Sequence, residues 1–291
     1  MTPDLLTIDC CSYIIEITHF QGSPPQISAL AANEIDFVGF GFSVLPTAVL
    51  NAGMSDLRVI ADMFQDGAPG AYSNEFLVLK DGPVKTLADM KGHVAATNSA
   101  GSAVDMVLRA IFRRAGLEDK RDVTIIEAAF GNMPAMLRDR KVDLVPGKRL
   151  TNDDPAIRAY ARTLFTQADA IGRAQMATVT ARAGFLEKNR AAVVDYLEDS
   201  FRELAWFRDP AHHDAVVKIY SDFTKIPAAQ FDPWLYVPGK DYYHDPQGLP
   251  DLDALQANID TMRSLGFIKS DLKIKDYADL SYVKEAAARL K

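Results

Sequence analysis

The feature that most constrains this chain is a regular alternation of short apolar runs with helical patterns over its first two thirds. Runs such as residues 35–40, 57–64 and 75–80 have the length of strands, and turns or apolar residues at helical spacing separate them. Strands that alternate with helices indicate an α/β protein whose sheet is mainly parallel. Further strands are predicted at 13–20, 93–97, 122–128, 141–146 and 177–182.

The last third of the chain is predicted to be helical. From about residue 183 the apolar residues follow helical periodicity, and a loop rich in Pro, Gly, Asp and Tyr (233–250) interrupts the pattern. A chain of 291 residues is long enough for two domains or one large one. Its content of 48% hydrophobic and 24% charged residues is typical of a globular protein and excludes a wholly disordered or fibrous chain.

Charge and cysteine content exclude several classes of protein. With 32 basic and 39 acidic residues the net charge is −7, which argues against general nucleic-acid binding. The adjacent Cys10 and Cys11 are poorly placed to bridge each other, so no structural disulfide is expected. The uncharged stretch 37–55 contains glycines and a proline, and we interpret it as a strand, a turn and a helix rather than a membrane span.

Three junctions share one design, in which a strand ends, small residues follow and a helix begins. They are GFGFS (39–43), TNSAGS (97–102) and AFGNMP (129–134). The first N–H groups of a helix are unpaired and can bind an anion, and ligands of open α/β sheets lie beyond the carboxyl ends of the strands. Helix capping is the alternative interpretation of each junction, and TNSAGS carries more polar groups than a cap needs.

The remaining motifs leave alternatives open. GFGFSV matches only half of a dinucleotide-binding fingerprint, because Val44 replaces its third glycine. Lys148 and Arg149 follow a predicted strand and could contact an anion or lie in a solvated loop. An aromatic group in the 233–250 loop could wall a pocket or pack against the domain; its members are Trp234, Tyr236, Tyr242 and Tyr243.

Two stretches of this sequence resemble a known family. FQGSPPQISALAANEIDFVGFGFSVLPTAV and FLVLKDGPVKTLADMKGHVAATNSAGSA are similar to solute-binding proteins of nitrate, sulfonate and taurine ABC transporters, and the likeness runs from about residue 18 to the end. The resemblance implies the type II periplasmic-binding-protein fold, with two α/β lobes that close about two crossover strands. Lobe 1 would comprise 1–79 and the mostly helical 178–291, lobe 2 would comprise 80–177, and the crossovers would be 76–80 and 177–182.

The resemblance also implies a function and a site. The chain would be a monomeric periplasmic protein that captures a small organic anion, such as a sulfonate, taurine-like compound or aromatic acid, and delivers it to an ABC permease. It would bind no nucleic acid, span no membrane, and use no cofactor, metal or catalytic residue. The expected ligand contacts are Phe42, Ser43, Tyr72, Asn74, Asn98, Ser99, Gly101, Ser102, Gly131, Asn132 and Lys148.

One departure from the family's pattern supports a second hypothesis. The family's opening strand and helix have no counterpart ahead of Tyr13, and residues 1–11 lack the basic and apolar regions of a signal peptide, as expected for a cytoplasmic protein if the chain is complete. The fold also includes enzymes, among them aromatic-acid decarboxylases, sulfinate desulfinases and the thiamine-pyrimidine synthase. In that case Cys10 or Cys11 would be the candidate nucleophile, although no His or Arg partner for it is identifiable in the sequence. From the residues alone, Cys10, Cys11 and His19 could form a nucleophile–base set.

Overall fold

The computed structural model describes residues 12–20 and 24–290 of the chain. Its strands are β1 (Phe37–Gly41), β2 (Leu57–Asp66), β3 (Glu75–Leu79), β4 (Val94–Thr97), β5 (Thr124–Glu127), β6 (Val145–Gly147), β7 (Ala161–Thr166) and β8 (Ala174–Arg182). Its α-helices are α1 (Pro24–Ala31), α2 (Val44–Asn51), α3 (Ala103–Arg114), α4 (Met133–Arg138), α5 (Arg149–Asn152), α6 (Pro155–Tyr160), α7 (Gln167–Ile171), α8 (Ala183–Lys188), α9 (Arg190–Phe207), α10 (His213–Thr224), α11 (Leu252–Ser264) and α12 (Ser281–Ala288).

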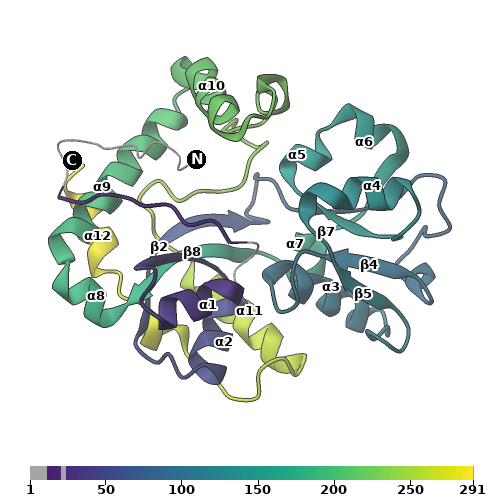
Figure 1. Cartoon of the computed structure of the whole chain (residues 1–291), viewed down its shortest axis with the longest axis horizontal. Coiled ribbons are helices and arrows are strands. Elements are labelled where there is room, and N and C mark those ends of the chain that lie inside the picture. Colours follow the sequence, from purple (N-terminus) through teal and green to yellow (C-terminus); the bar gives the residue numbers. More distant parts are fainter. Residues whose placement is uncertain (1–11, 21–23, 291) are drawn as a thin grey trace.

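The strands form two groups that lie side by side (Figure 1). One group is a three-stranded sheet in the order β1-β8-β2, and we call the part built on it the β8 half. The other group is a sheet in the order β6-β3-β7 with a β4-β5 pair, and we call that part the β3 half. A bridge between Ala95 and Leu144 ties the β4-β5 pair to the strand segment that leads into β6.

Helices cover both faces of the sheet in the β8 half. Val38 and Phe40 of β1 turn to one face and pack in a cluster with residues of α2 and α11. Ala181 of β8 lies in a second cluster with α8, α9 and α12, against which Phe37 packs. Successive residues of a strand point to opposite faces, so β1 contributes to both clusters.

The predicted mainly parallel pairing is wrong for both three-stranded sheets. β8 runs antiparallel to β1 and to β2, and β3 runs antiparallel to β6 and to β7, while β4 and β5 are parallel. Alternation of strands and helices does give β1 and β2 the same direction. It does not reveal that β8, which comes much later in the chain, lies between them and reverses both ladders.

Two segments connect the halves: residues 67–74 lead from β2 to β3, and α7 with residues 172–173 leads from β7 to β8. They touch each other, because the Ser73 hydroxyl accepts a hydrogen bond from the Ala168 N–H at 3.0 Å. The predicted lobe boundaries fall at the end of β3 (79/80) and inside β8 (177/178). This division of the chain stays a prediction.

The predicted strand 13–20 is wrong. The segment 12–20 is in neither a helix nor a strand, and its Ile14, Ile15 and Ile17 side chains are exposed. A strand needs a neighbour for its N–H and C=O groups, and no described strand lies along this segment as a ladder partner. The sequence analysis also missed β7 and the short helices α5, α6 and α7.

Several local predictions are confirmed. Residues 37–55 contain a strand, a turn and a helix, in β1 and α2, and Gly53 follows α2 with φ +69°. Helix α3 begins after its N-cap Ser102 and ends with Arg113 and Arg114 in its last turn, as its basic end predicts. Among the helices in the described residues, none is long and apolar enough to cross a membrane.

Candidate ligand-binding site

The carboxyl ends of three strands meet at one edge of the β3 half. β4 is parallel to β5, and the Ala95–Leu144 bridge makes it parallel to the segment leading into β6. The loops that follow these ends carry many of the predicted ligand contacts, which are Asn98, Ser99, Gly101, Ser102, Gly131, Asn132 and Lys148. Two of the loops touch, since the Lys148 Nζ lies 4.0 Å from the centre of the Phe130 ring.

The 98–102 turn is a helix cap whose N–H groups are largely engaged. The Ser102 hydroxyl accepts from the Asp105 N–H (3.2 Å) and donates to Asn98 Oδ1 (2.8 Å). The Gly101 N–H donates to Asp105 Oδ2 at 2.9 Å, and the Ala100 N–H donates to Glu127 Oε1 at 3.1 Å. Two carboxylates of the protein therefore already lie against this turn, and a ligand anion there would have to approach or replace them. Ligand contact at this turn stays a prediction.

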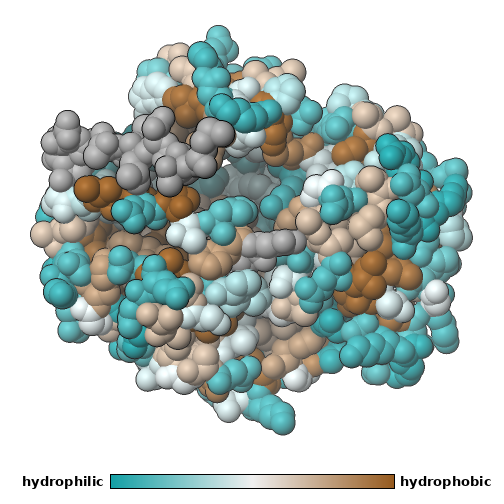
Figure 2. Space-filling model, in the orientation of Figure 1, coloured by the Kyte–Doolittle hydropathy of each residue, from teal (hydrophilic) through white to brown (hydrophobic). Residues whose placement is uncertain are grey.

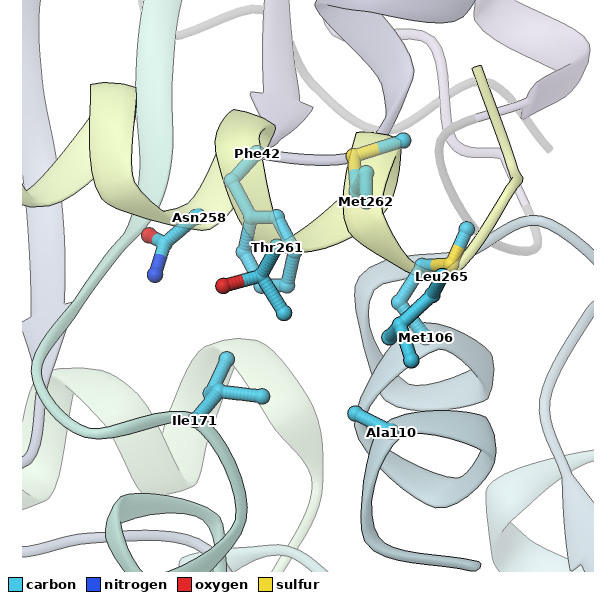
Figure 3. A pocket seen from close by; sticks show the side chains of 8 residues that line it. All are labelled: Phe42, Met106, Ala110, Ile171, Asn258, Thr261, Met262 and Leu265. Atoms are coloured by element: carbon cyan, nitrogen blue, oxygen red, sulfur yellow. The ribbon is translucent and has the colours of Figure 1, made fainter. Parts of the chain in front are cut away.

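Ser43 and Phe42 lie where the two halves touch. The fully buried Ser43 donates its hydroxyl to the Gly101 carbonyl at 2.8 Å, which joins the start of α2 to the turn before α3. The buried Phe42 lines a small pocket together with residues of α3, α7 and α11 (Figure 3). The other lining residues are Met106, Ala110, Ile171, Asn258, Thr261, Met262 and Leu265. This pocket is largely apolar, so it offers little to an anion.

Asn74 is held by hydrogen bonds within the connecting segments. Its side chain donates to Gln167 Oε1 at 3.2 Å and accepts from the Tyr242 hydroxyl at 2.6 Å. Its N–H donates to Asp66 Oδ2 at 2.8 Å. These contacts fix the path of the chain between β2 and β3, and they leave little of the Asn74 amide for a ligand.

Tyr72 reaches the start of α5, which the sequence analysis did not predict. The Asn152 amide donates to the Tyr72 hydroxyl and, at 3.1 Å, to the Gly147 carbonyl. The Arg149 guanidinium lies 4.2 Å from the centre of the Tyr72 ring and 5.8 Å from that of Trp234. The only signal for this cluster in the sequence was the basic pair that follows β6. Asn152 was missed.

Burial changes the pKa values of two charged groups at this edge. Burial by the surrounding protein lowers the pKa of Lys148, although its side chain remains exposed. Burial raises the pKa of Asp153, whose carboxylate lies 3.2 Å from Arg149 Nε. Among the residues that the structure describes, Lys148 has no ion-pair partner, so this edge carries an uncompensated cation.

The aromatic loop packs against the protein and also borders the site. Trp234 is buried in a cluster with α10 residues, while Tyr242 meets the Tyr72 ring edge-on at 5.2 Å and lies 4.9 Å from the Phe64 ring. Leu150 of α5 packs against the same cluster as Trp234. Between α10 and α5, this face of the molecule is hollowed (Figure 2). The packing interpretation therefore holds for Trp234, and Tyr242 adjoins predicted site residues.

The residues of the enzyme hypothesis cannot be assembled into a site. Cys10 and Cys11 lie outside the described residues, and His19 is exposed on the 12–20 segment. In the part of the chain that the structure describes, no group of three or more His, Cys, Asp or Glu side chains is placed to hold a metal ion.

Comparison with known proteins finds likenesses to solute-binding proteins and to an enzyme. An Escherichia coli (strain K12) protein whose name describes it as aliphatic sulfonates-binding is 32% identical over 106 residues, which are 36% of this chain and 30% of that protein. The periplasmic nitrate-binding protein of Synechocystis PCC 6803 has the same fold, with a TM-score of 0.70 at 13% identity over 94% of this chain and 80% of its own. A desulfurization enzyme shares the fold too, with a TM-score of 0.61 at 13% identity over 88% and 86%.

These likenesses confirm the predicted fold, which is that of the periplasmic binding proteins. At such low identity the solved structures carry the fold and not the ligand. The curated relative is matched over less than a third of its length, so its ligand is not transferred here. The model of the NMT1-like family matches residues 12–221, most of the chain, and the protein therefore belongs to the NMT1-like family.

Proposed function

We propose that this protein captures a small organic anion between its two halves and delivers it to the permease of an ABC transporter. The observation that carries the proposal is Lys148, an exposed ammonium group without an ion-pair partner among the described residues, at the edge where the ends of β4, β5 and β6 meet. An unpaired cation in a hollow between two halves attracts small anions. The sulfonate- and nitrate-binding relatives support the anionic class of ligand.

Capture would involve closure of the two halves on the ligand. The halves are joined by residues 67–74 and by α7 with residues 172–173, which is a narrow connection suited to a hinge. We take 80–177 as the moving lobe and 1–79 with 178–291 as the other. The protein would act as a monomer in the periplasm, since each chain carries both faces of the site.

A ligand screen tests this proposal. Melting temperatures would be measured with ethanesulfonate, taurine, nitrate, benzoate and 4-hydroxybenzoate. A ligand at about 100 times its Kd stabilises the protein by about 2.7 kcal/mol, which should raise Tm by several degrees. Failure of every anion to raise Tm would overturn the proposal.

A matched pair of variants tests the role of Lys148. Lys148→Gln should weaken binding of the best anion about tenfold or more, because it removes a charge-assisted contact. Lys141→Gln removes the same charge from an exposed residue of the same half and should leave the affinity unchanged. Equal losses of affinity in the two variants would show that the net charge of the protein, and not a contact from Lys148, determines anion binding.

Recovery of the ligand separates binding from catalysis. We expect mass spectrometry to recover the bound compound unchanged, as a binding protein requires. Consumption of the compound would instead favour the enzyme hypothesis. Cys10→Ser and Cys11→Ser would then test the cysteines, because a cysteine mechanism predicts loss of turnover in one of them.

A further inference from the structure

The ammonium group of Lys148 lies over the ring of Phe130, and this contact joins two loops at the proposed ligand edge. Lys148 Nζ is 4.0 Å from the centre of the Phe130 ring. The face of an aromatic ring carries partial negative charge and attracts a cation, most strongly when the cation lies over the ring at such a distance. The ring of Phe130 therefore restricts where the Lys148 ammonium can lie.

Phe130 is held in place by its own surroundings. It begins the short 3₁₀ helix Phe130–Asn132, which follows β5 and leads directly into α4. Its ring packs against a core cluster of the β3 half that includes Met133 and Val145. A ring that is packed against a core keeps one orientation, so Phe130 offers a fixed surface to the cation.

The backbone of Lys148 is fixed, whereas no ion pair fixes its side chain. Lys148 is the N-cap of α5, and its carbonyl accepts from the Thr151 N–H (2.9 Å) and the Asn152 N–H (2.8 Å). No carboxylate in the described part of the chain pairs with its ammonium group. A lysine side chain is flexible and loses rotamer freedom when it binds a ligand. The contact with Phe130 removes part of that freedom before the ligand arrives, which favours binding.

We propose that Phe130 is a positioning residue that holds the Lys148 ammonium in place for the anionic group of the ligand. The inference rests on the proposed function and adds the residue that orients its cation. An ammonium group has three N–H donors, and the ring lies on one side of it, so donors remain for an anion. Phe130 acts through Lys148 and does not itself have to touch the ligand.

Matched substitutions test this inference by calorimetry. The probe is whichever of ethanesulfonate, taurine, nitrate, benzoate and 4-hydroxybenzoate raises Tm most. Phe130→Leu keeps an apolar side chain but removes the ring, and it should weaken binding of the probe about threefold to tenfold. Phe130→Tyr keeps the ring and should bind as the wild type does. Phe185→Leu, at a half-buried phenylalanine of α8 in the β8 half, is the control and should also leave the affinity unchanged. Equal affinities of the wild type and Phe130→Leu would overturn the inference.

A double-mutant cycle separates positioning from packing. If Phe130 acts through Lys148, then Phe130→Leu should cause no further loss of affinity in a protein that already carries Lys148→Gln. The loss caused by Phe130→Leu should thus depend on the presence of the ammonium group. A loss of the same size in both backgrounds would show that Phe130 acts on the packing of the loop, and it would overturn the inference.

NMR of the protein without ligand tests the contact itself. Reductive methylation with ¹³C labels lysine side chains and keeps their charge. The Lys148 signal, identified by its absence in Lys148→Gln, should be displaced upfield by the aromatic ring in the wild type and in Phe130→Tyr but not in Phe130→Leu. An undisplaced signal in a wild-type protein that binds the probe would overturn the inference and leave the proposed function intact. Binding of none of the five anions would overturn both.

Discussion

Asp66, at the end of β2, provides a test of the physical reasoning that can be worked out in free energy. Its side chain is fully buried, and it accepts hydrogen bonds from the Ser73 hydroxyl (2.6 Å) and the Asn74 N–H (2.8 Å). Burial raises the pKa of Asp66 to about 6, and the two hydrogen bonds only partly oppose this rise. Ser73 also contacts the second connecting segment through the Ala168 N–H, so Asp66 anchors the junction between the halves.

The raised pKa fixes both the sign and the size of the pH effect. An aspartate in an unfolded chain titrates near 3.9, so the folded state binds this proton more tightly by about two pKa units, or about 3 kcal/mol. That stabilisation is fully present below about pH 4 and is lost as the pH rises through about 6. The free energy of unfolding should therefore fall across this range on account of Asp66.

Asp66→Asn removes the titrating group while keeping its shape. Its Oδ1 can accept from the Asn74 N–H, and its Nδ2 can donate to the Ser73 hydroxyl, which both accepts and donates. Urea unfolding of variant and wild type would be measured at pH 4, 5, 6 and 7. Between pH 4 and pH 7 the unfolding free energy of the wild type should fall by about 2 kcal/mol relative to that of the variant.

An exposed aspartate is the control for this experiment. Asp81 is 74% exposed in its side chain and pairs with Arg140 at 2.9 Å, and Asp81→Asn controls for the removal of one carboxylate from the surface. Other groups that titrate in acid cancel in the difference between variant and wild type. If the Asp66→Asn and wild-type profiles are parallel within 1 kcal/mol, the assignment of a raised pKa to Asp66 is refuted.

Three further predictions concern the fold. Phe76→Ala removes a fully buried ring and should lower the free energy of unfolding by about 3–5 kcal/mol in urea titrations. Gly67 and Gly70 both have positive φ, but a Cβ at Gly67 would lie 2.9 Å from the Ala168 Cβ whereas Gly70 has open space. Gly67→Ala should therefore lower Tm more than Gly70→Ala, and equal losses would mean that only backbone strain acts. Ile17→Lys should leave Tm within 1–2 °C of the wild type, because Ile17 is 78% exposed. A large loss of Tm would mean that the Ile17 side chain is buried, as it would be in the predicted strand.

The sequence predicted the elements that local chemistry determines. β1 and α2 follow from an apolar run, a small-residue turn and a helical pattern, and α3 follows from its Ser102 cap and basic end. Because these signals lie within a few residues of one another, no tertiary information is needed to detect them. The ends of β4, β5 and β6 also met at one edge, as parallel strands require.

The sequence could not predict pairings between distant segments. The insertion of β8 between β1 and β2 depends on the route of the whole chain, so no local pattern records it. Residues 13–20 have the composition of a strand, but a strand forms only where another offers its backbone groups. The short α5 was missed because TNDDP has the composition of a loop.

The two places where the halves meet differ in what they leave for a ligand. At the Ser43 end, the carboxylates of Asp105 and Glu127 already accept from the 98–102 turn, so another anion there would meet like charge. At the Arg149 end, Asp153 lies 3.2 Å from Arg149 and balances its charge, while Lys148 adds a positive charge that has no ion-pair partner among the described residues. The net charge thus favours the Arg149 end for the proposed anion, and an anion seated there would touch both halves through Arg149 and its aromatic neighbours.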